Sequence, residues 1–142
     1  NRLPVWAIGT SNGSLSAATA AVLLKERGPD GIVLTASTTS KPVPAAHPVT
    51  DAALDRVAVP TLFVHHKDDA CRVTPYGAIP GVMASMKQAR VVDLIAVEGG
   101  ENRGNPCHSG YHQFLGIEAT VTQQIADWIK RYQSTGKAGA GS

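Results

Sequence analysis

The sequence predicts an α/β fold, a parallel sheet with helices on both faces. Short apolar segments alternate four times with segments of helical character along the 142 residues. This alternation is typical of parallel strands joined by right-handed crossovers. Hydrophobic residues make up 43% of the chain and charged residues 17%, which fits a small globular domain with its own core.

The first half of the chain supplies two strands, a helix and a long loop, predicted at residues 4–8, 31–34, 14–27 and 37–48. Both strands are short apolar segments of the kind that are buried in parallel sheets, and both adjoin a glycine. The helix has apolar residues at helical spacing and ends at Gly28. The loop contains three prolines, which disfavour regular structure. The Thr50 hydroxyl is expected to cap a short helix that reaches Asp55.

The second half supplies two more strands, predicted at residues 59–64 and 91–97, and two more helices. Pro60 stands near the start of the third strand, where a missing N–H is tolerated. One helix is predicted through Val82, Met83 and Met86. The last helix is the clearest, because apolar residues recur every four positions, at Ile117, Val121, Ile125 and Ile129. Residues 136–142 are expected to form a flexible tail, which leaves residues 1–135 as the domain.

Composition and charge exclude several classes of function. Thirteen Lys and Arg against eleven Asp and Glu give a net charge of +2, which argues against nucleic acid or an anionic membrane as partner. Aromatic residues are only 5%, too few for base-stacking surfaces. No apolar run approaches the roughly 18 residues that a membrane span requires. No cofactor is expected.

A candidate nucleophile follows the first predicted strand, where residues 9–13 match the pattern G-x-S-x-G. A tight turn from strand to helix exposes the Ser11 hydroxyl on a strained backbone. We expect Gly9 and Gly13 to avoid side-chain collisions in this turn. The Asn12 N–H, at the start of a helix, is a candidate oxyanion donor. The alternative is that Ser11 is an ordinary turn or helix-cap residue.

A candidate acid and a candidate base follow the third and fourth strands. Asp68 and Asp69 come directly after the third strand, and His108 and His112 lie beyond the fourth. The carboxyl ends of parallel strands meet at one edge of the sheet, where ligands bind in such folds. A serine hydroxyl needs a base, and the base needs an orienting acid, so these residue types suit nucleophilic catalysis.

These motifs resemble the α/β-hydrolase superfamily, in the C-terminal half of its fold. Residues 4–24 resemble the fifth strand, the nucleophile elbow and the helix after it, and the order Ser, Asp, His is that of the superfamily. Residues 60–69 resemble the stretch P-x-L-x-x-x-G-x-x-D, with His66 in place of the usual glycine. Residues 110–114 resemble the histidine loop of secreted or periplasmic esterase-like members.

The resemblance assigns the roles within the candidate site. It implies that Ser11 is the nucleophile, Asp69 the acid and His112 the base, with Asp68 and His108 as the alternatives. The implied activity is that of a serine esterase, which cleaves small-molecule carboxylic esters through an acyl-enzyme. A peptidase or a thioesterase on the same fold is an alternative, because the triad does not determine the substrate.

The resemblance also implies an incomplete fold. The superfamily has about eight strands and this chain fits four, so the N-terminal strands and the loop that usually supplies a second oxyanion donor are not accounted for. We expect a fragment of a longer hydrolase that associates with a missing N-terminal half or with itself. The alternative is a non-catalytic fragment that acts as an interaction module through its open sheet edge.

Two cysteines flank the implied acid and base. Cys71 lies two residues after Asp69, and Cys107 lies five residues before His112, so the fold would bring them together as a disulfide. A disulfide implies an oxidising compartment, the periplasm or the cell exterior. The rival is a zinc site built from a subset of His65, His66, Cys71, Cys107 and His108. Because no paired Cys/His spacing repeats, we expect no metal.

Overall fold

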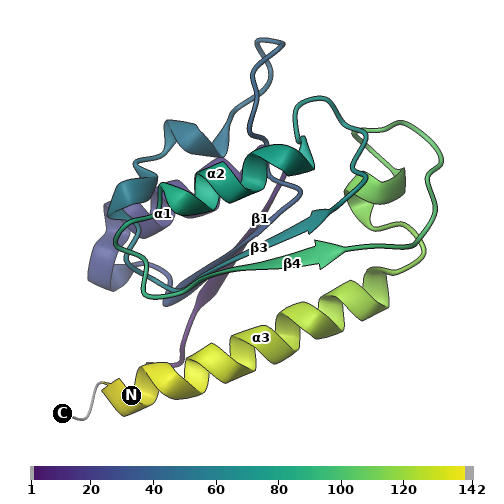
Figure 1. The fold of residues 1–142 in the computed structure, drawn as a ribbon. Helices are drawn as coiled ribbons and strands as arrows, with labels where there is room; N and C mark the ends of the chain where they lie inside the picture. The colour runs from purple at the N-terminus through teal and green to yellow at the C-terminus, as the bar shows by residue number, and fades with distance from the viewer. Residues whose placement is uncertain (1, 140–142) are drawn as a thin grey trace.

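The structure is a computed structural model and describes residues 2–139. It contains one parallel sheet whose four strands follow chain order, β1 (Trp6–Thr10), β2 (Gly31–Thr35), β3 (Thr61–His66) and β4 (Val92–Val97). Helices α1 (Gly13–Leu24) and α2 (Ile79–Ala84) lie on one face, and α3 (Glu118–Gly139) lies on the other (Figure 1). The predicted parallel α/β sheet with helices on both faces is therefore confirmed.

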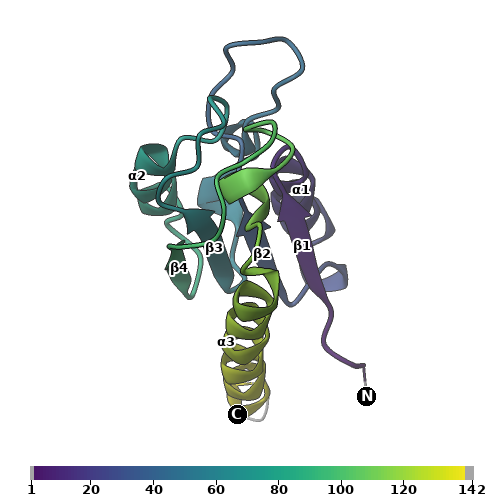
Figure 2. The same cartoon turned by 90° about the vertical axis from the view of Figure 1, so that its right-hand side faces the viewer.

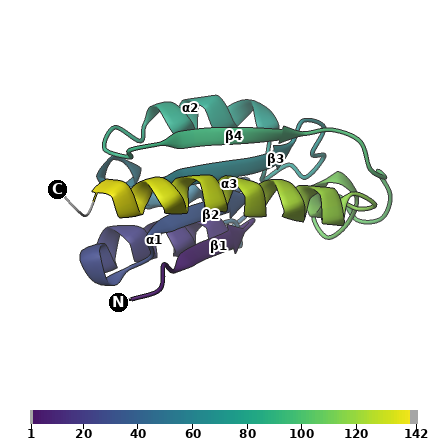
Figure 3. The same cartoon turned by 90° about the horizontal axis from the view of Figure 1, so that it is seen from below.

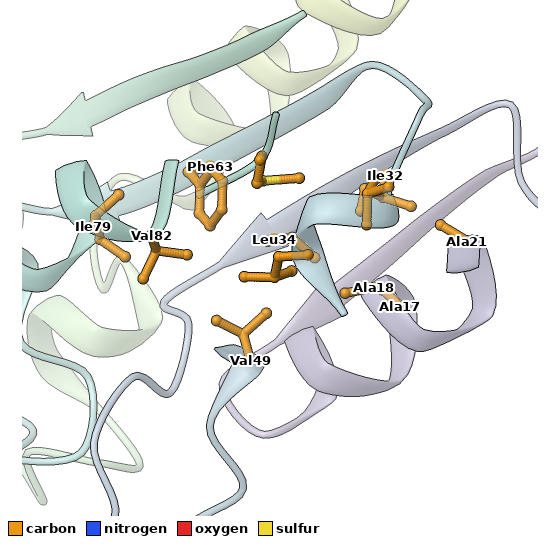
Figure 4. Close-up of a cluster of buried hydrophobic side chains, with 12 residues drawn as sticks. Ala17, Ala18, Ala21, Ile32, Leu34, Val49, Phe63, Ile79 and Val82 are labelled. Atoms are coloured by element: carbon orange, nitrogen blue, oxygen red, sulfur yellow. The ribbon is translucent and has the colours of Figure 1, made fainter. Parts of the chain in front are cut away.

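The face covered by α1 and α2 carries the larger core. Alternate residues of the central strands point to this face, namely Ile32, Leu34 and Phe63, and none of them is exposed to solvent. Small residues on α1, Ala17, Ala18 and Ala21, let that helix lie close to the sheet (Figure 4). Burial of this apolar surface is the main stabilising contribution on this side of the sheet.

The face covered by α3 is packed by the predicted apolar stripe of the last helix. Val33, Leu62 and Val64 of the sheet pack in one cluster with Val121 and Trp128. The Trp128 indole N–H and the Tyr132 hydroxyl both donate to the Asp93 carboxylate, at 2.7 and 3.1 Å. Because α3 crosses the middle of this face, β1 lies beyond it at the edge (Figure 3).

Strand β1 differs from its prediction in both position and burial. It begins two residues later than predicted, because its pairing with β2 runs from Trp6 opposite Gly31 to Thr10 opposite Thr35. It is an edge strand of the described sheet, and Ile8 is 57% exposed. A groove of about 330 Å³ separates Ile8 and Thr10 from α3. The prediction of a buried first strand is therefore wrong at Ile8 and Thr10, which are both exposed.

Two further predictions can be compared with the structure. The short helix expected at residues 50–55 is two separate 3₁₀ turns, Val49–Asp51 and Leu54–Arg56, and the Thr50 side chain caps neither. Helix α3 continues to Gly139 and so includes the first residues of the predicted tail, whereas residues 140–142 lie outside the described residues. Among residues 2–139, no helix is long and apolar enough to span a membrane.

Candidate active site

The turn after β1 holds Ser11 in a left-handed conformation. Its φ is +56°, which is uncommon for a residue with a side chain, and its N–H donates to the Thr35 carbonyl at 2.9 Å. Gly9 makes the turn possible, because a Cβ at Gly9 would lie 2.2 Å from the Gly13 carbonyl oxygen. A Cβ at Gly13 would have no atom within 4 Å, so the collision predicted there is wrong.

The Ser11 hydroxyl has one side-chain contact among the described residues. Its oxygen lies 3.4 Å from the Thr38 hydroxyl oxygen, at the limit of a hydrogen bond. The Thr38 hydroxyl itself donates to the Asn12 side-chain oxygen at 3.0 Å. Within residues 2–139, Ser11 and His112 share no hydrogen bond. In hydrolytic sites the hydrogen bond between nucleophile and base is often long or absent before substrate binds.

Asn12 has separate roles for its backbone and its side chain. Its backbone N–H comes just before α1 and has no acceptor among the described residues, which leaves it free to bind an anion. Its side chain donates to the Ala45 carbonyl and accepts from the His47 N–H, both at 3.0 Å. These bonds fasten the proline-containing loop, which rises beyond the strand ends (Figure 2), to the residue after Ser11.

Asp69 and His112 form a buried pair at the same end of the sheet. The Nδ1 atom of His112 lies 2.9 Å from Oδ2 of Asp69, and the two side chains are 1% and 0% exposed. Among the described residues 2–139, both hydrogen bonds of the His112 ring involve Nδ1, and none involves Nε2. Asp68 is exposed, and His108 is exposed, so of the candidate residues the structure pairs Asp69 with His112.

Asp69 is surrounded by donors that favour its charged form. Burial alone would raise its pKa, but hydrogen bonds from His112, His65 and the Cys71 N–H outweigh burial and hold the pKa well below its usual range. The Cys71 N–H donates to Oδ1 at 2.9 Å, and the Thr74 hydroxyl donates to Oδ2 at 2.8 Å. The carboxylate therefore stays negative and can orient the His112 ring.

Two residues of this cluster had no role beside the acid and base in the sequence-based interpretation, although His65 was a candidate zinc ligand. Thr74 is fully buried and contacts both Asp69 and the Nδ1 of His112, at 2.8 and 3.2 Å. His65 is fully buried, its Nε2 lies 2.8 Å from the Thr74 carbonyl, and it lies 3.4 Å from Oδ2 of Asp69. The position of His65 at the end of an apolar segment was a sequence signal for a functional residue, whereas no sequence pattern pointed to Thr74.

A disulfide joins the loop that carries Asp69 to the loop that carries His112. It links Cys71 to Cys107, whose Cα atoms are 4.8 Å apart. The expected pairing is confirmed. Because both cysteines are oxidised, neither offers the thiolate that the zinc alternative needs, and the ring of His66 is bound to the Gly99 carbonyl at 2.8 Å.

Comparison with known proteins identifies the fold. The chain superposes on an α/β hydrolase from a Medee basin deep-sea metagenome with a TM-score of 0.63 and 16% identity, over 91% of this chain and 54% of that one. The chain has the α/β-hydrolase fold. Thermogutta terrifontis esterase 2 matches with a TM-score of 0.61 and 14% identity, over 89% and 54% of the two chains. Est1E from Butyrivibrio proteoclasticus, solved with ferulic acid, matches with a TM-score of 0.57 and 15% identity, over 90% of this chain and 61% of that one.

The α/β-hydrolase fold seen here is part of the larger one in those structures. The chain spans between 52% and 61% of the length of three of the solved structures it resembles. No protein-family model matches the sequence, and no curated protein matches it. The sequence-based prediction of an α/β-hydrolase-like sheet is confirmed. Ser11 directly follows β1, Asp69 lies three residues after β3, and His112 lies in the 3₁₀ turn Gly110–Gln113 beyond β4.

Proposed function

We propose that this chain carries the nucleophile, acid and base of a serine hydrolase that cleaves small carboxylic esters. The observation that carries the proposal is the 2.9 Å hydrogen bond between buried Asp69 and His112. In this pair the His112 Nδ1–H donates to the Asp69 carboxylate, which leaves Nε2 to accept a proton. Ser11 lies on a strained turn at the same end of the parallel sheet.

In the acylation step, Ser11 Oγ attacks the ester carbonyl carbon while His112 Nε2 takes the hydroxyl proton. The charge that develops on the carbonyl oxygen is stabilised by the free N–H of Asn12 at the start of α1. Collapse of the tetrahedral intermediate breaks the bond to the alcohol oxygen, which receives the proton from His112. Asp69 stays ionised throughout and stabilises the imidazolium.

In the deacylation step, water replaces the alcohol and the same groups act in reverse. His112 takes a proton from water as the water oxygen attacks the acyl carbon. The bond from Ser11 Oγ to that carbon then breaks, and the proton returns to Oγ. The products are a carboxylic acid and free enzyme, so atoms and charges balance without a cofactor or metal.

We also propose that further polypeptide completes the site. A full oxyanion hole needs a second donor, which in this fold comes from a loop before the nucleophile strand. The edge position of β1 and the exposed Ile8 leave room for more strands, supplied by an N-terminal half or by a second copy of the chain. The disulfide supports a periplasmic or secreted location.

The decisive experiment combines a fluorophosphonate probe with a short p-nitrophenyl ester. We expect the probe to label Ser11 and the chain to hydrolyse the ester, and S11A to lose both. The control is S16A, which changes an exposed serine on α1. Labelling of folded S11A, or undiminished hydrolysis by it, would show that the nucleophile is a different residue. No labelling of the folded wild-type chain would favour the non-catalytic alternative.

A thioesterase is the second candidate, because a solved thioesterase domain from the curacin biosynthetic pathway superposes on 87% of this chain with a TM-score of 0.52 and 10% identity. The triad chemistry is the same for esters and thioesters, so the two activities differ in substrate binding. Comparing kcat/KM for an ester and the thioester with the same acyl group distinguishes them. An excess of more than about tenfold for the thioester, about 1.4 kcal/mol in transition-state binding, would replace the esterase proposal.

A further inference from the structure

His66 occupies the position where the motif of the acid strand usually has glycine, and it is almost fully buried. It is the last residue of β3, and the ring is 1% exposed. Three groups surround the ring. The Asp68 N–H donates to Nδ1 at 3.0 Å, Nε2 lies 2.8 Å from the Gly99 carbonyl, and the ring stacks on Tyr111 with centroids 4.0 Å apart and planes 12° from parallel.

These contacts assign the protonation state of the ring. Nδ1 accepts a hydrogen bond from an amide, so it carries no proton. Nε2 faces a carbonyl oxygen, which can only accept, so the proton is on Nε2. The neutral Nε2–H form therefore satisfies both nitrogen atoms at once. A glycine at position 66 would offer none of the three contacts.

The three contacts join two loops that are far apart in the sequence. Asp68 belongs to the turn that carries Asp69, whereas Gly99 and Tyr111 belong to the connection between β4 and α3. Tyr111 is the residue immediately before His112. The His66 ring thus lies between the loop of the acid and the loop of the base. The Cys71–Cys107 disulfide is a second link between the same two loops.

We propose that His66 is a positioning residue that fixes His112 at hydrogen-bonding distance from Asp69. The stacking on Tyr111 and the hydrogen bond to the Gly99 carbonyl hold the loop that carries His112 against the His66 ring. The hydrogen bond from the Asp68 N–H holds the turn that carries Asp69 against the same ring. The expected effect on kcat rests on the proposed esterase function. The expected effect on the Asp69–His112 hydrogen bond is independent of that function.

The experiment compares four variants of the full chain by ester kinetics and by the downfield proton signal of His112 Nδ1–H. H66A removes all three contacts. H66N keeps an oxygen near the place of Nδ1, so it retains the local bond to the Asp68 N–H but loses the cross-loop contacts. On the other loop, Y111A removes the stacking partner and Y111F keeps its ring. The thermal unfolding midpoint of each variant checks that it is folded.

We expect H66A, H66N and Y111A to lose kcat by about 10- to 100-fold, since a displacement of the base by about 1 Å has that effect. The KM of H66A and H66N is expected to stay within about twofold, because the buried side chain of His66 is out of reach of substrate. The His112 Nδ1–H signal of all three variants is expected to broaden or vanish through exchange with water. Y111F is expected to match the wild-type chain in both measurements.

Other outcomes would overturn the inference. If H66N behaves as the wild-type chain, the only contact of His66 that matters is its local hydrogen bond with the Asp68 N–H. If H66A and Y111A keep both the Nδ1–H signal and kcat within about twofold of wild type, the pair is held without this ring. Should H66A fail to fold, Y111A and Y111F decide the question. A folded wild-type chain that neither hydrolyses the ester nor reacts with the fluorophosphonate would count against the proposed function, and the proton signal would still decide the inference.

Discussion

The acid and base of this chain are held differently from its nucleophile. Asp69 and His112 are buried, joined at 2.9 Å, and enclosed by loops that a disulfide links. Ser11 follows an edge strand, and among residues 2–139 its hydroxyl forms one side-chain hydrogen bond, a long one of 3.4 Å to Thr38. Its position is set by the left-handed backbone at Ser11 and by the close approach of Gly13 to Gly9, rather than by side-chain partners. The difference teaches that the acid–base pair is preorganised by this chain, while the nucleophile has an open side.

The largest effect that tests this comparison is expected from D69N. An amide in place of the carboxylate cannot stabilise the imidazolium or enforce the tautomer of His112, so kcat is expected to fall by about 10⁴-fold. Ester hydrolysis at pH 7 measures it. The matched control is D68N, which changes the exposed neighbouring acid and is expected to leave kcat unchanged. A loss of less than tenfold in D69N would mean that the acid–base pair contributes little to the reaction.

The same variant also tests the charge of Asp69 through stability. The pKa of Asp69 is lower in the folded chain than in the unfolded chain, so the folded state releases this proton more readily. Its contribution to stability is complete above the unfolded pKa near 4 and is lost as the pH falls toward the folded pKa. Urea unfolding between pH 7 and pH 2 should show a smaller acid-induced loss for D69N than for the wild-type chain. Equal losses would contradict this pKa direction.

Removing the disulfide is expected to have the next largest effect. The double variant C71S/C107S opens a link across 36 residues, which the loop-entropy model values at about 3–4 kcal/mol of unfolding free energy. Urea unfolding of the variant, beside the wild-type chain with and without reductant, measures it. A loss below about 1 kcal/mol would show that packing and hydrogen bonds already hold the two loops together.

The two glycines of the nucleophile turn should respond very differently to alanine. G9A places a Cβ against the Gly13 carbonyl and is expected to cost about 1–3 kcal/mol, because the turn must shift. G13A meets open space and is expected to change stability by less than about 0.5 kcal/mol. Chemical denaturation of both variants gives the comparison. Similar costs would mean that the turn tolerates displacement and that strain does not set the position of Ser11.

The smallest expected effect concerns the edge strand. I8A should cost less than about 1 kcal/mol, because more than half of Ile8 is already exposed at 57%. The reference is I32A in the central strand β2, whose fully buried side chain should cost about 2–5 kcal/mol. If I8A costs as much as I32A, then β1 is covered in solution by a second copy or by another polypeptide, and the nucleophile region is not open.

The elements of the fold could be predicted because each depends on local pattern. Four apolar segments became four strands, and the period-four stripe of residues 117–129 became the packing face of α3. The exact limits of β1 could not be predicted, because they follow from its pairing with β2. Its exposure depends on which strand lies beside it, which is a property of the whole sheet. Thr50 failed as a cap because the chain turns into 3₁₀ geometry there.

The candidate site was predictable in its residue types and less so in its supporting contacts. The roles of Ser11, Asp69 and His112 were assigned from the resemblance to the α/β-hydrolase superfamily, and the cysteine pairing from the closeness of the acid and base loops which that fold implies. The contact of Thr74 with Asp69 joins positions five apart through a loop, and a single threonine carries no signal for it. In the sequence, His66 stood out as a departure from a glycine motif and as a candidate ligand of the zinc alternative, and neither points to a link between loops. Its role as a link between loops depends on Tyr111, 45 positions further along the chain.

The chain-order arrangement of the sheet has a consequence for synthesis on the ribosome. Because β1, β2, β3 and β4 are neighbours in that order, each strand can pair with the one made just before it. Among the three candidate site segments, the turn with Ser11 is therefore made first, the Asp69 turn follows once β3 is added, and the loop with His112 comes last. Cys107 lies only five residues before His112, so the disulfide and the acid–base pair both require the same late-made segment of the chain.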